Sequence, residues 1–184
     1  MLAAAMKTPL IYGLYLALAG LLLNLGLFFA GYHSDPDKMM SVQWPSLVIF
    51  VAIAAILIVL GIKARRAEIP ASDDFGYGRA LWAGVLIGAF SCVIGIVTNL
   101  LYTRVINPRF KEVMIQGQIN KMEAAGLPSD QVEKMEKMMH SPVAAVVNTI
   151  AIICIIMVIY TIISLIAAAF LKRPAAGSMP PVTA

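Results

Sequence analysis

Four long blocks of apolar residues, separated by polar segments, dominate the pattern of the chain. A helix needs about 20 mostly apolar residues to cross a hydrocarbon layer of roughly 30 Å. No block shows the strict alternation of apolar and polar positions that is typical of a barrel strand. We therefore predict an all-α, polytopic membrane protein, a bundle of four transmembrane helices over residues 10–31, 45–62, 80–102 and 143–171.

The polar segment of residues 103–142 has a helical pattern of its own. Its first half places apolar residues at helical spacing and stops at Gly126, and its second half begins near Ser129 and ends near His140. One face of this second half is apolar, and its members are Val132, Met135, Met138 and Met139. The pattern predicts short amphipathic helices that cap the outer end of the bundle and dock through this face.

The other polar segments are short. Residues 63–79 form the predicted inner loop, and residues 172–184, rich in small residues and proline, form a tail that we predict to be disordered. With no further boundary in the pattern, we treat residues 1–184 as a single membrane domain. The first block is longer than the roughly 7–15 apolar residues of a signal peptide, so we expect it to be a retained span.

Composition and charge support this interpretation. Hydrophobic residues make up 60% of the 184-residue chain and charged residues only 13%, whereas soluble domains are nearer half apolar and about a quarter charged. The net charge of +4 comes from residues that flank the blocks rather than from a basic face. Nucleic acid is therefore excluded as a partner, and the lipid bilayer is the expected one.

Basic residues also bear on the orientation of the chain. They divide equally between the two sides, but Lys63, Arg65 and Arg66 and the pair Lys172 and Arg173 directly adjoin the ends of apolar blocks. Basic residues close to span ends favour the cytoplasmic side. We expect a multi-pass protein of a bacterial inner membrane with both termini in the cytoplasm.

Several short motifs occur in a characteristic order along the chain. They are YGL at residues 12–14, FGYGRALWAG at residues 75–84, NPRF at residues 107–110, MEKMMHSP at residues 135–142 and ISLIAAAFLKR at the end of the fourth block. In order and spacing the chain resembles the bacterial membrane-protein family called domain of unknown function 4199, from Met6 to about Lys172. The resemblance implies four spans and no established activity.

The apolar blocks contain no Asp, Glu, Lys, Arg or His. Proton-coupled transporters and pumps keep a titratable group inside the membrane, so this absence argues against both. The two cysteines, Cys92 and Cys154, lie within blocks and form no disulfide framework. No nucleophile or base can be nominated, and we expect neither catalysis nor a cofactor.

Three amides lie within the blocks at similar depth, Asn24, Asn99 and Asn148. They predict a polar layer, which either joins helices by hydrogen bonds or lines a pocket beneath the cap. A stripe of small residues, Gly84, Gly88, Cys92 and Gly95, follows one face of the third block. We expect this stripe to seat the fourth span or a partner subunit.

Methionine and histidine gather in the predicted outer segments, at Met39, Met40, Met135, Met138, Met139, His33 and His140. Thioether and imidazole groups suit Cu(I), but methionine also fills adaptable apolar faces, and we favour the second interpretation. No metal site is predicted.

The function best supported by these patterns is that of a structural or accessory membrane component, assembled as a homo-oligomer or within a larger membrane complex. The alternative is a binder or transporter of a small apolar or lipid-like ligand held between the cap and the bundle. A membrane enzyme ranks third.

Overall fold

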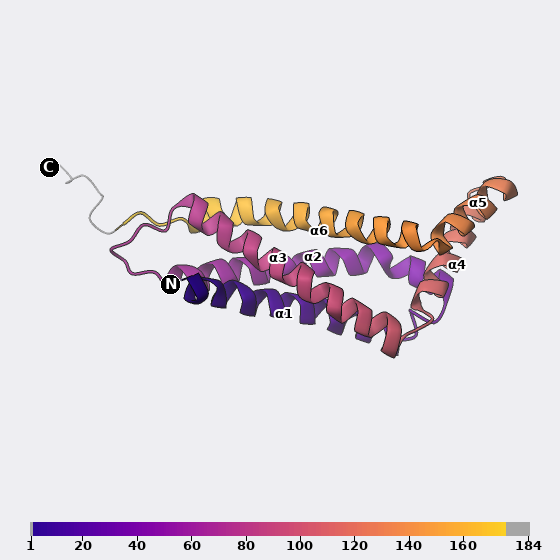
Figure 1. Ribbon diagram of the computed structural model, residues 1–184, viewed down its shortest axis with the longest axis horizontal. Coiled ribbons are helices and arrows are strands. Elements are labelled where there is room, and N and C mark those ends of the chain that lie inside the picture. Colours follow the sequence, from indigo (N-terminus) through magenta and orange to yellow (C-terminus); the bar gives the residue numbers. More distant parts are fainter. Residues whose placement is uncertain (1, 176–184) are drawn as a thin grey trace. The chain divides into compact units, whose positions relative to one another are not determined.

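The computed structural model describes residues 2–175, and all of its regular elements are helices. In chain order they are α1 (Leu2–Phe29), α2 (Pro36–Ala67), α3 (Tyr77–Leu101), the π-helical turn η1 (Tyr102–Ile106), α4 (Phe110–Ala124), α5 (Ser129–His140) and α6 (Pro142–Leu171) (Figure 1). Four segments are long and apolar enough to cross a membrane, Met6–Phe29, Pro36–Ala67, Tyr77–Ile106 and Pro142–Leu171. The predicted all-α fold with four spans is confirmed.

The chain divides into two compact units. Unit 1 comprises the residues up to Ala17, Ala52–Ile94 and the residues from Ile156 onward; unit 2 comprises Leu18–Val51 and Gly95–Ile155. The four long helices each contribute residues to both units. A long helix contacts different neighbours along its length, so a division of this kind leaves no signal in the sequence.

Glycines bring the helices of unit 1 close together. A Cβ at Gly13 of α1 would lie 2.7 Å from the Cβ of Phe90 in α3, and one at Gly61 of α2 would lie 2.9 Å from the Cγ of Tyr12. A Cβ at Gly88 of α3 would lie 3.0 Å from the Cβ of Tyr160 in α6. Small residues permit such close approach of membrane helices, and all four long helices pack together in this unit.

Two glycines end helices where the sequence predicts an end. Gly31 after α1 and Gly126 after α4 have φ values of 81° and 76°, which L-residues with a side chain rarely adopt. In both places the turn is closed by a hydrogen bond to the last helical turn, from the Tyr32 N–H to the Leu27 oxygen and from the Leu127 N–H to the Met122 oxygen. Both are Schellman motifs, which satisfy carbonyls left free at a helix end.

Helix α2 begins at Pro36, well before the predicted span start near Pro45. The Asp35 carboxylate accepts hydrogen bonds from the backbone N–H groups of Asp37 and Lys38, each 3.0 Å long. Asp35 is therefore an N-cap, and Pro36 occupies the first helical position, where its missing N–H costs nothing. The segment that we expected to be a short loop is the first part of the helix.

The chain after α6 is tied to the segment that precedes α3. Phe75 and Arg173 form an isolated antiparallel bridge with two backbone hydrogen bonds of 2.9 Å. The Arg173 guanidinium also donates to the carbonyl oxygens of Ile69 and Pro70, each at 3.0 Å. The prediction of a disordered tail is therefore wrong for its first residues, and the remainder of that prediction, residues 176–184, lies outside the described residues.

Candidate functional site

A buried aromatic cluster with two polar partners lies in unit 2, and we call it the Tyr102 cluster. Its members are Phe28, His33, Tyr102, Asn107 and Phe110. His33 Nδ1 lies 2.5 Å from the Tyr102 hydroxyl oxygen, and Asn107 Nδ2 donates to the same oxygen at 3.3 Å. The His33 and Tyr102 rings meet the ring of Phe110 edge to face, with centroid separations of 5.0 and 5.3 Å. Such geometry is favourable for aromatic pairs.

The backbone that carries this cluster changes its helical pitch. At the end of α3 the chain continues as the π-helical turn η1, and the Asn107 N–H donates to the Tyr102 carbonyl oxygen at 2.7 Å. A π-helical turn inserts a residue into the helical register and often occurs at functional positions. Here it places both the Tyr102 side chain and the Asn107 amide in the buried cluster, where Tyr102 is 1% and Asn107 is 5% exposed.

His33 is held as a neutral group. Burial lowers the pKa of His33 below its ordinary value, and no carboxylate of the described chain hydrogen-bonds to its ring. A neutral imidazole with its own proton on Nε2 accepts a hydrogen bond from the Tyr102 hydroxyl at Nδ1. The Tyr102 hydroxyl thus joins His33 and Asn107 in one buried hydrogen-bond network, an arrangement that favours a structural role.

This network predicts a dependence of stability on pH. Because folding lowers the pKa of His33, the unfolded chain binds a proton first as the pH falls. The free energy of unfolding is expected to decline as the pH drops below about 6.5 and to level off below the pKa of the folded state. Unfolding titrations of the detergent-solubilised protein at a series of pH values measure this decline.

The matched variant His33→Gln keeps a polar side chain at this position but removes the group that binds the proton. The other ionisable groups, including His140, remain in both proteins, so the difference between the two profiles reports His33. We expect a flatter profile for His33→Gln over this pH range. Superimposable profiles would show that the burial of His33 does not contribute.

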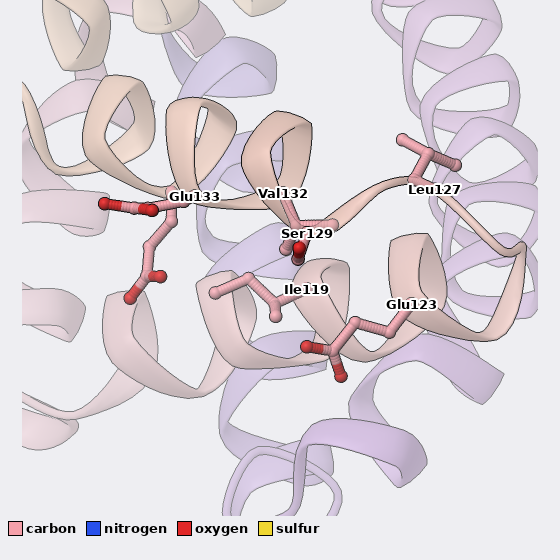
Figure 2. Close-up of a pocket in the computed structure, with 7 residues that line it drawn as sticks. Ile119, Glu123, Leu127, Ser129, Val132 and Glu133 are labelled. Atoms are coloured by element: carbon pink, nitrogen blue, oxygen red, sulfur yellow. The ribbon is translucent and has the colours of Figure 1, made fainter.

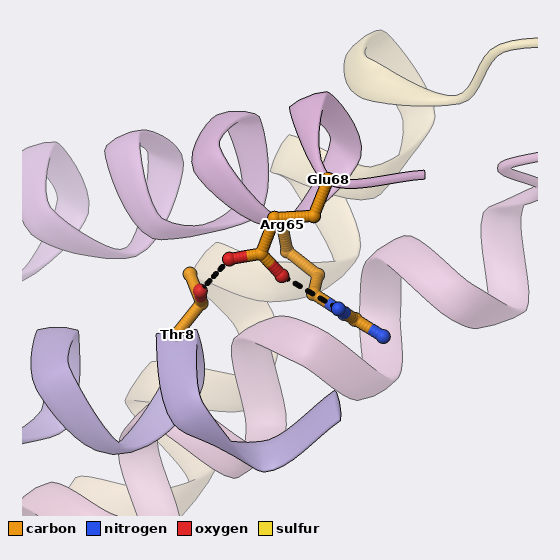
Figure 3. Close-up of polar contacts among 3 residues, drawn as sticks. All are labelled: Thr8, Arg65 and Glu68. Carbon is orange, nitrogen blue, oxygen red and sulfur yellow. Dashed lines mark hydrogen bonds and ion pairs between the residues drawn. The ribbon is translucent and has the colours of Figure 1, made fainter. Parts of the chain in front are cut away.

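Unit 1 holds a second polar group of residues, the Glu68 network. The two carboxylate oxygens of Glu68 accept hydrogen bonds from the Thr8 hydroxyl and from Arg65, whose guanidinium nitrogen lies 2.6 Å away (Figure 3). Burial raises the pKa of the Glu68 carboxyl, but these hydrogen bonds and the charges of Arg65 and Lys7 outweigh it and hold the pKa below its ordinary value. The network joins the start of α1 to the end of α2.

The apolar face predicted to dock the cap is divided in the structure. Val132 of α5 is buried against Ile115 and Ile119 of α4, and Met139 packs on the same cluster. Met135 and Met138 are 39% and 52% exposed. Helix α5 therefore uses part of this face to pair with α4. On the other side of α4, Gly117 lies against Met40 of α2, where a Cβ would be 2.8 Å from the Met40 Cγ.

A shallow hollow of about 280 Å³ lies between α4 and α5. Ile119 and Glu123 come from α4, and Ser129 and Val132 face them from the start of α5 (Figure 2). Its remaining lining residues are Leu127, Glu133 and Glu136. The sequence predicted that Asn24, Asn99 and Asn148 could line a ligand pocket beneath the cap. None of these three residues lines this hollow.

The predicted asparagine layer is not formed by side-chain hydrogen bonds. The Asn24 amide donates to the Gly20 carbonyl oxygen of its own helix at 3.1 Å. Asn99 and Asn148 are exposed, and within the described residues their amide groups have no hydrogen-bond partner. An asparagine can satisfy part of its hydrogen bonding within its own helix. A similar predicted depth in the membrane was therefore not enough to show that the three amides pair with one another.

The stripe of small residues on α3 has two different environments. In unit 1, Gly84 lies against Ser164 of α6 and Gly88 against Tyr160, so this part of the stripe seats the fourth span. Cys92 is half-buried. In unit 2, a Cβ at Gly95 would meet nothing within 4 Å, and this end of the stripe is open.

The methionine and histidine residues of the predicted outer segments have different surroundings. Met39 and Met40 are buried, and His33 belongs to the Tyr102 cluster. Across residues 2–175, no group of three or more His, Cys, Asp or Glu side chains is arranged to hold a metal ion.

Sequence reasoning missed the Tyr102 cluster and the Glu68 network. Asn107 and Phe110 lie in the NPRF motif that carries part of the family resemblance. His33 and Tyr102, which adjoin the predicted ends of two spans, pair over 69 positions. Thr8 and Glu68 pair over 60 positions, and no periodicity in the sequence indicates such a contact.

One comparison with known proteins gives a match. The family described as "Protein of unknown function (DUF4199)" matches residues 11–173, and this confirms the resemblance inferred from the motifs. No curated protein and no solved structure was found to match the chain.

Proposed function

The chain belongs to the DUF4199 family, and we propose that it is a non-enzymatic structural or accessory membrane protein that associates with a second copy of itself. The observation that carries the proposal is the open face of α3 in unit 2, formed by Gly95 and Asn99 and called here the open α3 face. A small residue and an amide one turn apart are the two elements that membrane helices use to associate.

The open α3 face lacks partners within the described chain. The space around Gly95 is empty out to 4 Å from a Cβ position, and Asn99 is exposed with no hydrogen bond to its amide. An amide left without a partner in hydrocarbon is unfavourable, whereas a hydrogen bond between membrane helices stabilises by roughly 0.5–2 kcal/mol. A second helix seated on Gly95 would supply the missing partner.

A second copy of the chain fits this face by symmetry. Two copies inserted in the same orientation are related by a two-fold axis along the membrane normal, and such an interface is self-complementary. Gly95 would then lie opposite Gly95, which allows a close approach, and Asn99 would lie opposite Asn99, whose amide is both donor and acceptor. An exposed apolar residue, Ile96, lies beside the face on α3.

The rest of the proposal concerns the role and the location of the protein. The apolar blocks contain no Asp, Glu, Lys, Arg or His, which supports a non-enzymatic role without proton coupling. We place the protein in a bacterial inner membrane, and the basic residues that adjoin span ends support an orientation with both termini in the cytoplasm. Exposed Met135 and Met138 on α5 support an amphipathic helix that rests at the membrane surface.

The test replaces Gly95 by leucine and measures self-association in lipid bilayers by single-molecule photobleaching. Because Gly95 has open space around it, Gly95→Leu leaves the fold of the single chain intact and blocks only the approach of a partner. We expect the dissociation constant of the dimer to rise at least about tenfold. Asn99→Leu is expected to raise it by about 2- to 30-fold.

The matched control is Gly26→Leu, because a Cβ at Gly26 of α1 also meets nothing within 4 Å. This variant adds the same apolar surface on a different helix and is expected to dimerise like the wild type. A monomeric wild-type protein at every protein-to-lipid ratio would contradict the proposal. An Asn148→Leu variant that dissociates while Gly95→Leu does not would move the interface to α6 and contradict it as well.

A further inference from the structure

A groove between α2 and α6 of unit 1 has the form of a lipid site. Its volume is about 360 Å³, and we call it the α2–α6 groove. Ala55, Val59 and Lys63 line it from α2, and the main lining residues from α6 are Ile166, Ala167 and Phe170. The groove is separate from the open α3 face and from the Tyr102 cluster in sequence position and in lining residues.

The shape of the groove follows from the sizes of its side chains. Ala55 and Ala167 contribute one methyl group each, and they leave a hollow between the two helices. Ile166 and Phe170 form the wall on α6, where they are 58% and 81% exposed. An exposed apolar wall along a small-residue floor suits a flexible hydrocarbon chain.

Charge is present at one end of this groove. Among the residues that line it, Lys63 alone is charged, and its ammonium group makes no ion pair or hydrogen bond within residues 2–175. Arg65 is engaged by Glu68, so it is not available to the groove. Arg66 lies one turn beyond Lys63 on the same side of α2. This end of the groove therefore offers the positive charges of Lys63 and Arg66 to an anion.

The length of the groove agrees with a single membrane leaflet. From Ala55 to Lys63 the helix rises about 12 Å, at 1.5 Å per residue. Half of a hydrocarbon core of roughly 30 Å is about 15 Å. A chain that lies along the groove thus extends from the headgroup level toward the middle of the bilayer, with its polar end at Lys63.

We propose that the α2–α6 groove binds an anionic phospholipid of the surrounding membrane. One acyl chain lies along Ala55, Val59 and Ala167, and the phosphodiester accepts hydrogen bonds from the Lys63 ammonium. Basic pockets between membrane helices recognise anionic headgroups in this way. A zwitterionic lipid carries its own ammonium group next to the phosphate and leaves the charge of Lys63 and Arg66 unbalanced.

The test is native mass spectrometry of the full chain extracted from bilayers that contain equal amounts of phosphatidylglycerol and phosphatidylethanolamine. We expect one phosphatidylglycerol to stay bound in mild detergent. Lys63→Gln is expected to reduce its retention about fivefold relative to phosphatidylethanolamine. The control Lys7→Gln removes the same charge from an exposed residue of the same unit, and retention is expected to be unchanged.

A second variant tests the groove rather than the charge. Ala55→Phe fills the hollow, and it is expected to release the lipid while Lys63 remains in place. Equal retention of the two lipids by the wild type would show ordinary surrounding lipid only and overturn the proposal. Equal losses in Lys63→Gln and Lys7→Gln would show a general surface charge effect and overturn it too. Retention in Ala55→Phe would place the lipid elsewhere on the chain.

Discussion

Replacing Phe75 by alanine is expected to lower the free energy of unfolding by about 3–5 kcal/mol. Phe75 is completely buried, and its backbone forms the bridge with Arg173. Truncation leaves a cavity at the point where the segment before α3 meets the chain after α6. Packing around a deleted ring relaxes only in part, so the lost contacts are not recovered. Denaturation of the purified protein in mixed detergent micelles measures the change.

The matched control for this prediction is Phe29→Ala. Phe29 ends α1 and is 80% exposed, so the same substitution there removes few contacts and is expected to change the free energy of unfolding by less than about 0.5 kcal/mol. If Phe75→Ala proved as mild as Phe29→Ala, the buried bridge would not be a significant part of the stability of unit 1. A cysteine introduced as Pro174→Cys reports on the bridge. If the bridge opens, this cysteine is labelled faster by a thiol reagent in the Phe75→Ala background than in the wild-type background.

The second large effect is expected for Gly84→Leu. A Cβ at this position would lie 2.7 Å from the Cβ of Ser164 and 3.1 Å from the Cδ1 of Ile62. Both neighbours are buried, and the Ser164 hydroxyl already donates to the Tyr160 carbonyl oxygen at 2.7 Å. A leucine there forces α3 and α6 apart, and we expect a loss of about 3 kcal/mol.

Gly95→Leu is the internal comparison for this loss, because it makes the same change on the same helix where no atom lies within 4 Å of the Cβ position. In detergent that keeps the protein monomeric, its free energy of unfolding is expected to stay within about 0.5 kcal/mol of the wild type. Similar losses in the two variants would mean that leucine is disfavoured on α3 for a reason other than contact with α6.

The sequence predicted the features that depend on local physical chemistry. Continuous apolar blocks without the alternation of a barrel strand predict helical spans, because only helices and closed barrels satisfy the hydrogen bonds of a backbone within the bilayer. Gly126 predicts a helix end because a left-handed turn is easy for glycine. Pro142 predicts the start of α6, because the fixed φ and the missing N–H of proline suit the first position of a helix. Helix α6 begins at that residue.

The features that depend on distant pairs could not be predicted in the same way. His33 and Tyr102 lie 69 positions apart. Asn107 reaches the Tyr102 hydroxyl through the turn η1, and the sequence of this turn has no pattern that distinguishes a π-helical turn from an α-helical one. The asparagine layer failed for a related reason, since Asn24 found an acceptor one turn away in its own helix. The early start of α2 was in principle predictable, because Asp35 followed by Pro36 is a helix-start signal.

With four spans, we expect both ends of the described chain on one side of the membrane and the α4–α5 pair on the other. Cysteine labelling in intact cells tests it most directly, with Lys134→Cys and Lys172→Cys introduced separately after Cys92 and Cys154 are replaced by alanine. Both lysines are exposed. An impermeant thiol reagent is predicted to label position 134 in intact cells and position 172 only after the membrane is opened. Labelling of both positions from the same side would contradict the four-span account.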